Sequence, residues 1–261
     1  MLSGLSGWLG TGLLCLGVLA AQAEDQFVIE TPLPAPETSE IDTQYRLAKQ
    51  AGNRRDFQEA RDRLEEVLRL KPDHLEADLS LGVALMVLGE SEAGQARLER
   101  ISTLSDPIAH RAFLLLANQA SIEERPDDVI RYYAQAVEHF PDTFVMRYNL
   151  AKTLADQERF EEAAPAFEAA LMLKPGAKQA WTGLGQTLAE LGRPFDAEVC
   201  FRRTIALDPG NIYARMYLAR ILAGRGEKES AYTLYDEALQ SAVRVGNKTA
   251  VLSIRLEQDA L

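Results

Sequence analysis

Hydrophobic and small residues recur along the chain with a period of 34 residues, lengthened once by a single insertion. Each period also carries a small residue followed four residues later by a large one, such as Ala197 and Phe201. Spacings of three, four and seven residues place side chains on one face of an α-helix. The pattern therefore predicts two amphipathic helices in each period. Its clearest column holds leucines followed directly by alanine or glycine, at Leu47, Leu81, Leu116, Leu150, Leu184 and Leu218.

Prolines recur with the same period and mark the ends of the second helices. Proline lacks an amide hydrogen and clashes with the preceding turn, so a helix rarely continues through it. Within one period, Gly192-Arg193-Pro194 separates the first helix from the second. We therefore expect antiparallel helix pairs joined by short turns. The recurring prolines are Pro72, Pro107, Pro141, Pro175 and Pro209.

One period shows the pattern most fully. It reads WTGLGQTL over residues 181–188, followed by Ala197, Phe201 and Pro209. This resembles the tetratricopeptide repeat (TPR) motif W-x2-L-G-x2-Y, A-x3-F and P, with Leu188 in place of the tyrosine. The resemblance identifies an architecture that serves many unrelated functions.

The resemblance implies an all-α fold, a right-handed superhelical α-solenoid of about six TPR helix pairs followed by a C-terminal capping helix. One helix pair cannot bury both of its faces, so each pair stacks on the next and stability is nearly a sum of neighbour interactions. We expect the repeats to cover residues 41–245. The six units are residues 41–74, 75–109, 110–143, 144–177, 178–211 and 212–245.

The capping helix is expected within residues 246–261. Asn247 is a candidate N-cap for a helix from about Thr249 to Ala260. Leu252 and Leu256 continue the leucine columns, so we expect them to face the repeats. The polar side that an end repeat needs is expected to hold Ser253, Arg255, Glu257 and Asp259.

The first 40 residues have a different character. Residues 1–23 lack charged side chains and contain an apolar stretch that runs into Ala21-Gln22-Ala23, a pattern typical of a cleaved signal peptide. An uncleaved anchor is the alternative, although the apolar stretch is shorter than the roughly 20 residues of a spanning helix. Residues 24–40 are acidic and proline-rich, which predicts a disordered linker.

Charge and composition narrow the class of partner. The chain has 261 residues, with 28 Lys and Arg against 39 Asp and Glu, for a formal net charge of −11. A field of this sign repels nucleic acid and anionic lipid. We therefore expect a protein or peptide partner, no nucleic acid, and no direct membrane insertion after signal cleavage.

The candidate chemical residues do not combine into a catalytic or metal site. His74, His110 and His139 fall near predicted turns and lack partners at metal-ligand spacing. Cys200 lies between Ala197 and Phe201 with no adjacent His or Lys to lower its pKa, so it is expected to be a packing residue. We expect no enzyme, no cofactor and no metal.

A ligand surface is instead implied by the resemblance. TPR solenoids bind ligands on a concave surface lined by the first helix of each pair, on the side opposite the leucine column. Carried over by position, this protein-binding groove holds Tyr45, Lys49, Leu79, Val83, Met86, Leu114, Asn118, Ile122, Tyr148, Lys152, Gln186, Tyr213, Met216 and Arg220, with Thr182 also on this side.

The functional hypothesis follows from the signal and the groove. We expect an exported, non-enzymatic TPR adaptor, located in a bacterial periplasm or secreted. It would bind protein or peptide segments in its groove and support assembly or regulation of a cell-envelope complex. The alternative is a self-associating structural scaffold whose concave or end surfaces pack on copies of itself.

Overall fold

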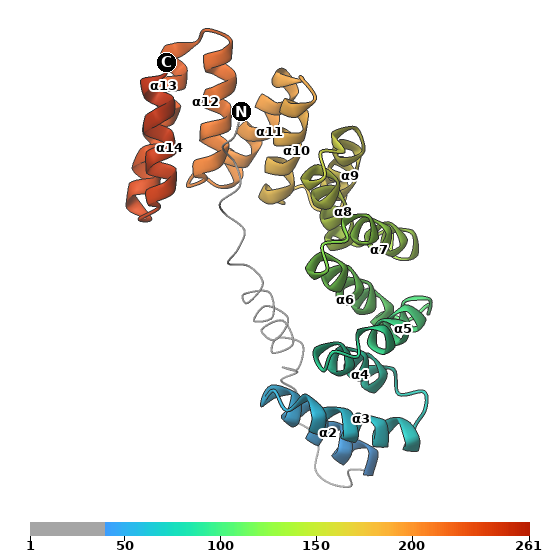
Figure 1. Cartoon of the computed structure of the whole chain (residues 1–261). Helices are drawn as coiled ribbons and strands as arrows, with labels where there is room; N and C mark the ends of the chain where they lie inside the picture. Colours follow the sequence, from blue (N-terminus) through green and yellow to red (C-terminus); the bar gives the residue numbers. More distant parts are fainter. Residues whose placement is uncertain (1–39) are drawn as a thin grey trace, which may run out of the picture. The chain divides into compact units, whose positions relative to one another are not determined.

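The computed structural model describes residues 40–261, and this part of the chain consists of helices joined by short turns. Thirteen helices follow one another in this part of the chain (Figure 1), which confirms the predicted all-α class. The described residues divide into two compact units, residues 40–128 and 129–261. The helices are α2 (Glu40–Asn53), α3 (Phe57–Leu70), α4 (Leu75–Val87), α5 (Ser91–Ser102), α6 (Ile108–Ile122), α7 (Pro126–His139), α8 (Phe144–Asp156), α9 (Phe160–Leu173), α10 (Lys178–Glu190), α11 (Pro194–Leu207), α12 (Ile212–Gly224), α13 (Lys228–Arg244) and α14 (Lys248–Asp259).

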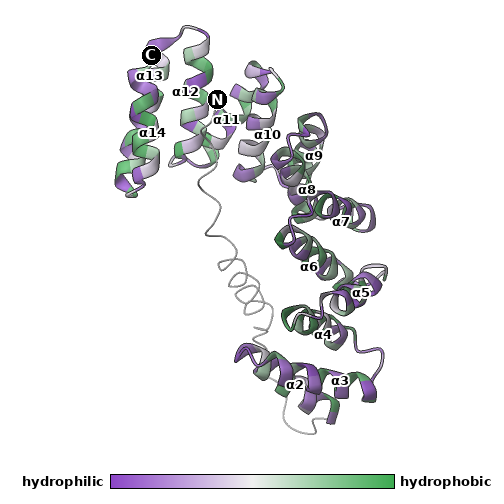
Figure 2. Cartoon of the chain, in the orientation of Figure 1, coloured by the Kyte–Doolittle hydropathy of each residue, from purple (hydrophilic) through white to green (hydrophobic). Residues whose placement is uncertain are grey.

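In the first unit, helices α2 to α6 pack on one another in chain order. The core between α3 and α4 includes Leu64, Val67, Leu81 and Leu85. Leu81 belongs to the predicted leucine column, and the structure buries it completely. Helices α4 and α6 are the most hydrophobic in this unit, as their mostly green ribbons show (Figure 2).

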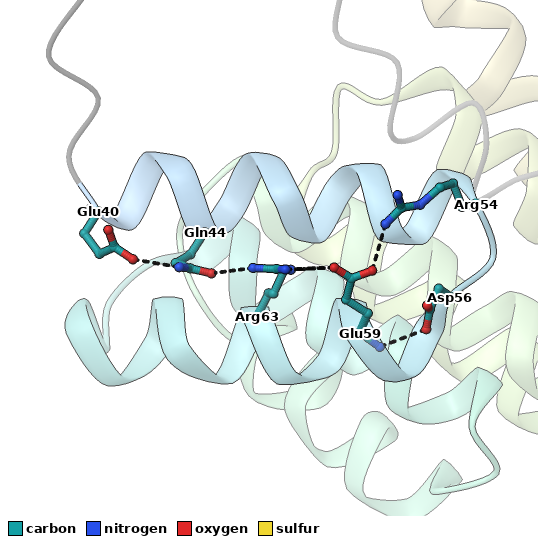
Figure 3. Close-up of polar contacts among 6 residues, drawn as sticks. All are labelled: Glu40, Gln44, Arg54, Asp56, Glu59 and Arg63. Carbon is teal, nitrogen blue, oxygen red and sulfur yellow. Dashed lines mark hydrogen bonds and ion pairs between the residues drawn. The ribbon is translucent and has the colours of Figure 1, made fainter.

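A chain of polar contacts runs between α2 and α3 (Figure 3). Arg63 of α3 donates hydrogen bonds to Gln44 Oε1 at 3.0 Å and to Glu59 Oε1 at 2.9 Å. Gln44 donates to Glu40 at 2.6 Å, and Arg54 donates to Glu59 at 2.7 Å. These residues are partly or fully exposed, so each contact contributes little free energy. Two of them, from Arg63 to Gln44 and from Arg54 to Glu59, connect α3 with α2 and the turn that follows it.

In the second unit, the helix pairs α8–α9, α10–α11 and α12–α13 stack in series, and α14 packs on α13. One hydrophobic core runs through all of them. The small-residue column explains the close approach within a pair. At Gly185 of α10, an added Cβ atom would lie 2.8 Å from Cε1 of Phe201 on α11, so only glycine admits the aromatic ring at this point.

The turn between the two helices of each pair has a repeated backbone conformation. One residue in each turn has a positive φ: Gly89, Gly192 and Gly226 supply it in three turns. Arg55, Glu124 and Glu158 supply it in the others, with φ values of 61°, 55° and 59°. These positions recur with the period of the repeat. Side chains other than glycine are strained in this region, so three turns carry local strain.

Helix α14 forms as predicted, but a different side of it packs against the repeats. Asn247 is its N-cap, as predicted, and its side chain accepts a hydrogen bond from Ala250 N at 3.0 Å. The buried side holds Ala250 and Ile254. Leu252 and Leu256 are 63% and 72% exposed, so the expectation that they face the repeats is wrong.

Of the polar residues predicted on the outer side of α14, Arg255 and Asp259 are exposed as expected, but Glu257 is not. Glu257, expected on the outer side, instead turns inward to accept a hydrogen bond from Tyr235 Oη at 2.7 Å.

The leucine column marks the side of a first helix that its own second helix covers. Among residues 40–261 no helix covers that side of α14, so its hydrophobic column is exposed.

The predicted signal peptide of residues 1–23 lies outside the described residues, as does the predicted linker up to residue 39. Glu40, assigned to the linker, is the first residue of α2. None of the helices in residues 40–261 has the length and hydrophobicity needed to cross a membrane.

Candidate functional site

The first helices of three successive pairs, α8, α10 and α12, line a groove of about 910 Å³ in the second unit. The helical period explains which side chains reach it. Leu184 is buried in the core. Thr182 and Gln186 are each rotated roughly 200° around α10 from Leu184, and both line the groove. Each first helix therefore has one side in the core and the opposite side open to a ligand.

Aromatic rings form much of the groove. Phe167 and Phe201 are buried below it, and Gly183 lies over Phe167, where an added Cβ atom would be 2.5 Å from the ring. Tyr217 stacks on Phe201 with ring centroids 5.3 Å apart. Tyr148 meets Phe167 edge to face at 6.1 Å. The rings are thus held in place by packing, which reduces the entropy that a ligand must overcome to bind.

Amide side chains offer the groove's open hydrogen-bonding groups. Thr182 and Thr187 use their hydroxyl groups within α10, donating to Lys178 O at 2.9 Å and Gly183 O at 2.8 Å. Gln179 and Gln186 line the groove, and their amides form no hydrogen bond with any residue of the described part. An amide both donates and accepts, so these two match an extended peptide backbone.

The three basic side chains of the groove are all paired. Lys152 lies 2.6 Å from Asp156, and Lys178 donates to Asp208 at 2.8 Å. The hydrogen bond from Lys178 holds the pKa of Asp208 below its usual range. Arg220 forms the third pair, with Glu257 of α14. Hydrogen bonding to Glu257 raises the pKa of Arg220, so this guanidinium stays charged.

Two acidic side chains of the groove are not paired. Glu158 follows the end of α8, and Glu190 is the last residue of α10. Neither forms an ion pair with a residue in the range 40–261. Both lie at helix C-terminal ends, where the helix dipole adds partial negative charge. This rim of the groove is therefore electronegative.

The structure brings together most of the residues that the sequence placed in the groove of this unit. Tyr148, Lys152, Gln186, Tyr213 and Arg220 all line it.

Met216 is the exception, because it is buried in the hydrophobic core, and its assignment to the groove is wrong. Tyr217, the next residue, lines the groove instead. Met216 was assigned to the groove because it occupies the same repeat position as Tyr148 and Thr182. This assignment misses the groove residue Tyr217 by one position. The step of four from Tyr213 to Tyr217 and then three to Arg220 follows the helix period and could have identified Tyr217.

In the first unit, the predicted groove residues differ in how accessible they are to a ligand. Leu79 is 1% exposed and lies in the core, so its assignment to an accessible groove is wrong. Lys49 lies over the ring of Tyr45, 4.8 Å from its centroid, and that ring is 4.8 Å from His74. The remaining predicted residues are partly buried or exposed: Val83, Met86, Leu114, Asn118 and Ile122.

A smaller pocket of about 430 Å³ in the first unit is lined by other residues, including His74, Glu76, Ile108 and Arg111. Arg111 Nη1 lies 2.7 Å from Glu76 Oε1, so these two charges are paired with each other. His74 serves as the N-cap of α4, accepting a hydrogen bond from Ala77 N at 3.2 Å. The sequence placed His74 near a turn but did not indicate this capping contact.

Cys200 is buried, as the sequence predicted. Burial, together with the nearby acidic Asp196 and Glu168, raises the pKa of its thiol to about 11. The thiol is therefore protonated at neutral pH and is a poor nucleophile. Within residues 40–261, no cluster of three His, Cys, Asp or Glu side chains has the arrangement of a metal site.

Solved structures with the same architecture resemble this chain at low sequence identity. YrrB, described as a TPR protein with an unusual peptide-binding site, matches with a TM-score of 0.60 and 19% identity, over 74% of this chain and 97% of YrrB. MamA AMB-1 matches with a TM-score of 0.51 and 22% identity, over 66% of this chain and 93% of MamA. No curated protein sequence matches. These likenesses establish the shared fold.

The family assignment rests on sequence profiles. Profiles of the tetratricopeptide repeat match residues 53–107 and, in overlapping copies, residues 114–178, 148–212 and 182–242. Together they span most of the helical region, and their period agrees with the helix pairs of the structure. The chain therefore belongs to the tetratricopeptide repeat family.

Proposed function

We propose that this protein is an exported, non-enzymatic adaptor that binds a peptide or protein segment in the groove of α8, α10 and α12. The observation that carries the proposal is the groove itself, which is long enough to touch three first helices and offers about 910 Å³. Ligand sites generally combine such apolar concave surfaces with a few placed polar groups.

The kinds of side chain in the groove support a peptide ligand. Tyr148, Tyr213 and Tyr217 offer large contact areas with little rotamer entropy to lose. Gln179 and Gln186 can bond backbone amides without regard to side-chain sequence. TPR proteins of this fold include YrrB, whose structure is described as having a peptide-binding site.

The charge of the rim suggests which peptides bind best. Glu158 and Glu190 are unpaired with the rest of the described chain, so a Lys or Arg of the ligand would gain an ion pair there. An acidic residue at the same position would be repelled. We therefore expect ligands with a basic side chain near an aromatic or aliphatic one, and affinity that falls with salt.

A displayed library of random peptides, selected on the full chain, tests the groove. Tyr213→Ala should weaken the selected peptides by about tenfold or more, because interface tyrosines are frequent binding hot spots. Tyr232→Ala on α13 is the matched control, since Tyr232 is 56% exposed and lies outside the groove, while Tyr213 is 53% exposed. Equal losses in both variants, or none in either, would contradict the assignment.

We also propose export to a cell envelope, where the adaptor would support assembly or regulation of a complex. The support is the apolar segment that ends at Ala21-Gln22-Ala23, a cleavage-site pattern. Intact mass of the protein from fractionated cells tests this. A chain beginning at Glu24 in the envelope fraction is the expected result, and a chain that keeps residues 1–23 in the cytoplasmic fraction contradicts it.

A further inference from the structure

Helix α14 carries a second hydrophobic side that no described residue covers. Leu252 and Leu256 lie one period after Leu218 and Leu222 of α12. The two residues of α12 are buried in the core together with Ala231 and Tyr235 of α13. The same column is therefore covered by a following helix on α12 and is open on α14.

The inward side of α14 is already used. Ala250 and Ile254 are buried there. Glu257 adds contacts with Arg220 and Tyr235, so the helix is firmly attached to α12 and α13. Its exposed leucines cannot turn inward without breaking these contacts. Two adjacent leucines, each more than 60% exposed on a well-anchored helix, form a site suited to packing against another helix.

The charges beside the leucines indicate which helix packs against α14. Lys248 begins α14 and Asp259 ends it, and both are exposed on the same side as the leucines. Neither has an ion-pair partner within the described chain. The two charges lie about 16 Å apart along the helix, with the leucines between them. The side is thus positive at its start and negative at its end, and its centre holds the two leucines with the exposed Arg255 beside them.

Such a surface is self-complementary: in a second copy rotated by 180°, the negative end of α14 faces the positive end of the first copy. In an antiparallel pair of α14 helices centred on residue 254, Leu252 of one copy opposes the partner's Leu256. Lys248 then lies near the partner's Asp259. A two-fold axis makes each contact twice, which is the arrangement of an isologous interface. We propose that two copies of this chain associate through antiparallel packing of their α14 helices.

The interface is small, because it consists mainly of one helix of twelve residues from each copy. Specific stable interfaces bury about 1,200–2,000 Å² in total, more than a single helix pair provides. The association is therefore weak and reversible. It leaves the groove of α8, α10 and α12 to its ligand, so it adds to the proposed function without depending on it.

Sedimentation of the full chain over a concentration range tests the proposal. The average mass of wild type should rise from one chain toward two at concentrations on the order of 100 µM. Leu252→Glu with Leu256→Glu should remove the rise, while circular dichroism and the melting temperature stay near wild type because both positions are exposed. Association through residues 1–39 would be common to both proteins, so the difference between them is the readout.

The matched control is Phe195→Glu with Val199→Glu on α11. This pair has the same spacing and similar exposure but lies away from α14. It should associate like wild type. A mass that never rises in wild type, or one that falls equally in control and α14 variant, overturns the proposal. Capture of a different protein by α14, with wild type monomeric throughout, also overturns it and assigns the site to that protein.

Charge reversal tests the antiparallel arrangement. Lys248→Glu alone and Asp259→Lys alone should each weaken association roughly fivefold, since each places like charges together twice in the dimer. The two reversals combined should restore it to near the wild-type value. Failure of the combined variant to recover, while each single variant still folds, would rule out this antiparallel register.

Discussion

The contact between Glu257 and Arg220 joins the last helix to the groove, and one substitution breaks it. Glu257 accepts a hydrogen bond from Arg220 Nε at 2.7 Å and one from Tyr235 Oη at 2.7 Å. Hydrogen bonds to charged groups contribute about 1.5–3 kcal/mol. The Arg220 side chain is 49% exposed, so solvent screening reduces the contribution. We expect Glu257→Gln to destabilise α14 by about 1 kcal/mol at neutral pH.

The same contact makes the stability of α14 depend on pH. Burial alone would raise the pKa of Glu257, but hydrogen bonds from Arg220 and Tyr235 outweigh it and lower this pKa. A carboxyl group with a lowered pKa in the folded state stabilises the fold above its unfolded pKa, about 4.3, and loses this effect as the pH falls through the folded pKa. The difference between wild type and Glu257→Gln should therefore shrink below about pH 4.5.

Hydrogen exchange of the backbone amides in residues 252–258 measures this locally. Repeat arrays open unit by unit, so an end helix reports its own contacts. We expect exchange in α14 to be roughly fivefold faster in Glu257→Gln at neutral pH. The control is Glu229→Gln on α13, whose carboxylate forms no ion pair with a described residue. Exchange unchanged in Glu257→Gln, or a difference that persists in acid, would refute the reasoning.

Three further experiments test the positive-φ turns, the Cys200 thiol and the buried position of Leu79. Glu158→Gly should raise the midpoint of urea unfolding by relieving a φ of 59°, worth up to about 1 kcal/mol, whereas Glu161→Gly inside α9 should lower it. Cys200 should react with a thiol reagent at pH 8 far more slowly than in urea, because its pKa is about 11; equal rates would mean that the thiol is open. Leu79→Ala should cost about 2–5 kcal/mol by thermal unfolding, and Ile122→Ala, which is more exposed, much less.

The helix pairs could be predicted because the residues that define them interact mainly within one period. Gly185 lies against Phe201 inside a single pair, and Leu184 belongs to the same core, so their spacing in the sequence is enough to identify their role. The positive-φ turns were harder to find. Glycine marks some of them, but Arg55 and Glu158 occupy the same position without any conformational preference for it.

The groove could be predicted only in part, because exposure depends on neighbouring helices. Tyr148 and Met216 occupy equivalent positions two periods apart, yet one lines the groove and the other lies in the core. Exposure in the last helix, α14, depends on neighbouring helices in the same way. Leu252 continues a buried column and is nevertheless exposed, since its burial requires a helix that residues 40–261 do not supply.

The central claim, that the groove of α8, α10 and α12 holds a peptide segment of a partner, is tested most directly by crosslinking in the cells that make the protein. A photoreactive amino acid is placed at Tyr213 in the groove or at Tyr232 outside it. The account predicts a covalent adduct with another protein at position 213, with the linked residue in a short segment of that partner, and little at position 232. Adducts at 232 with none at 213 would contradict it.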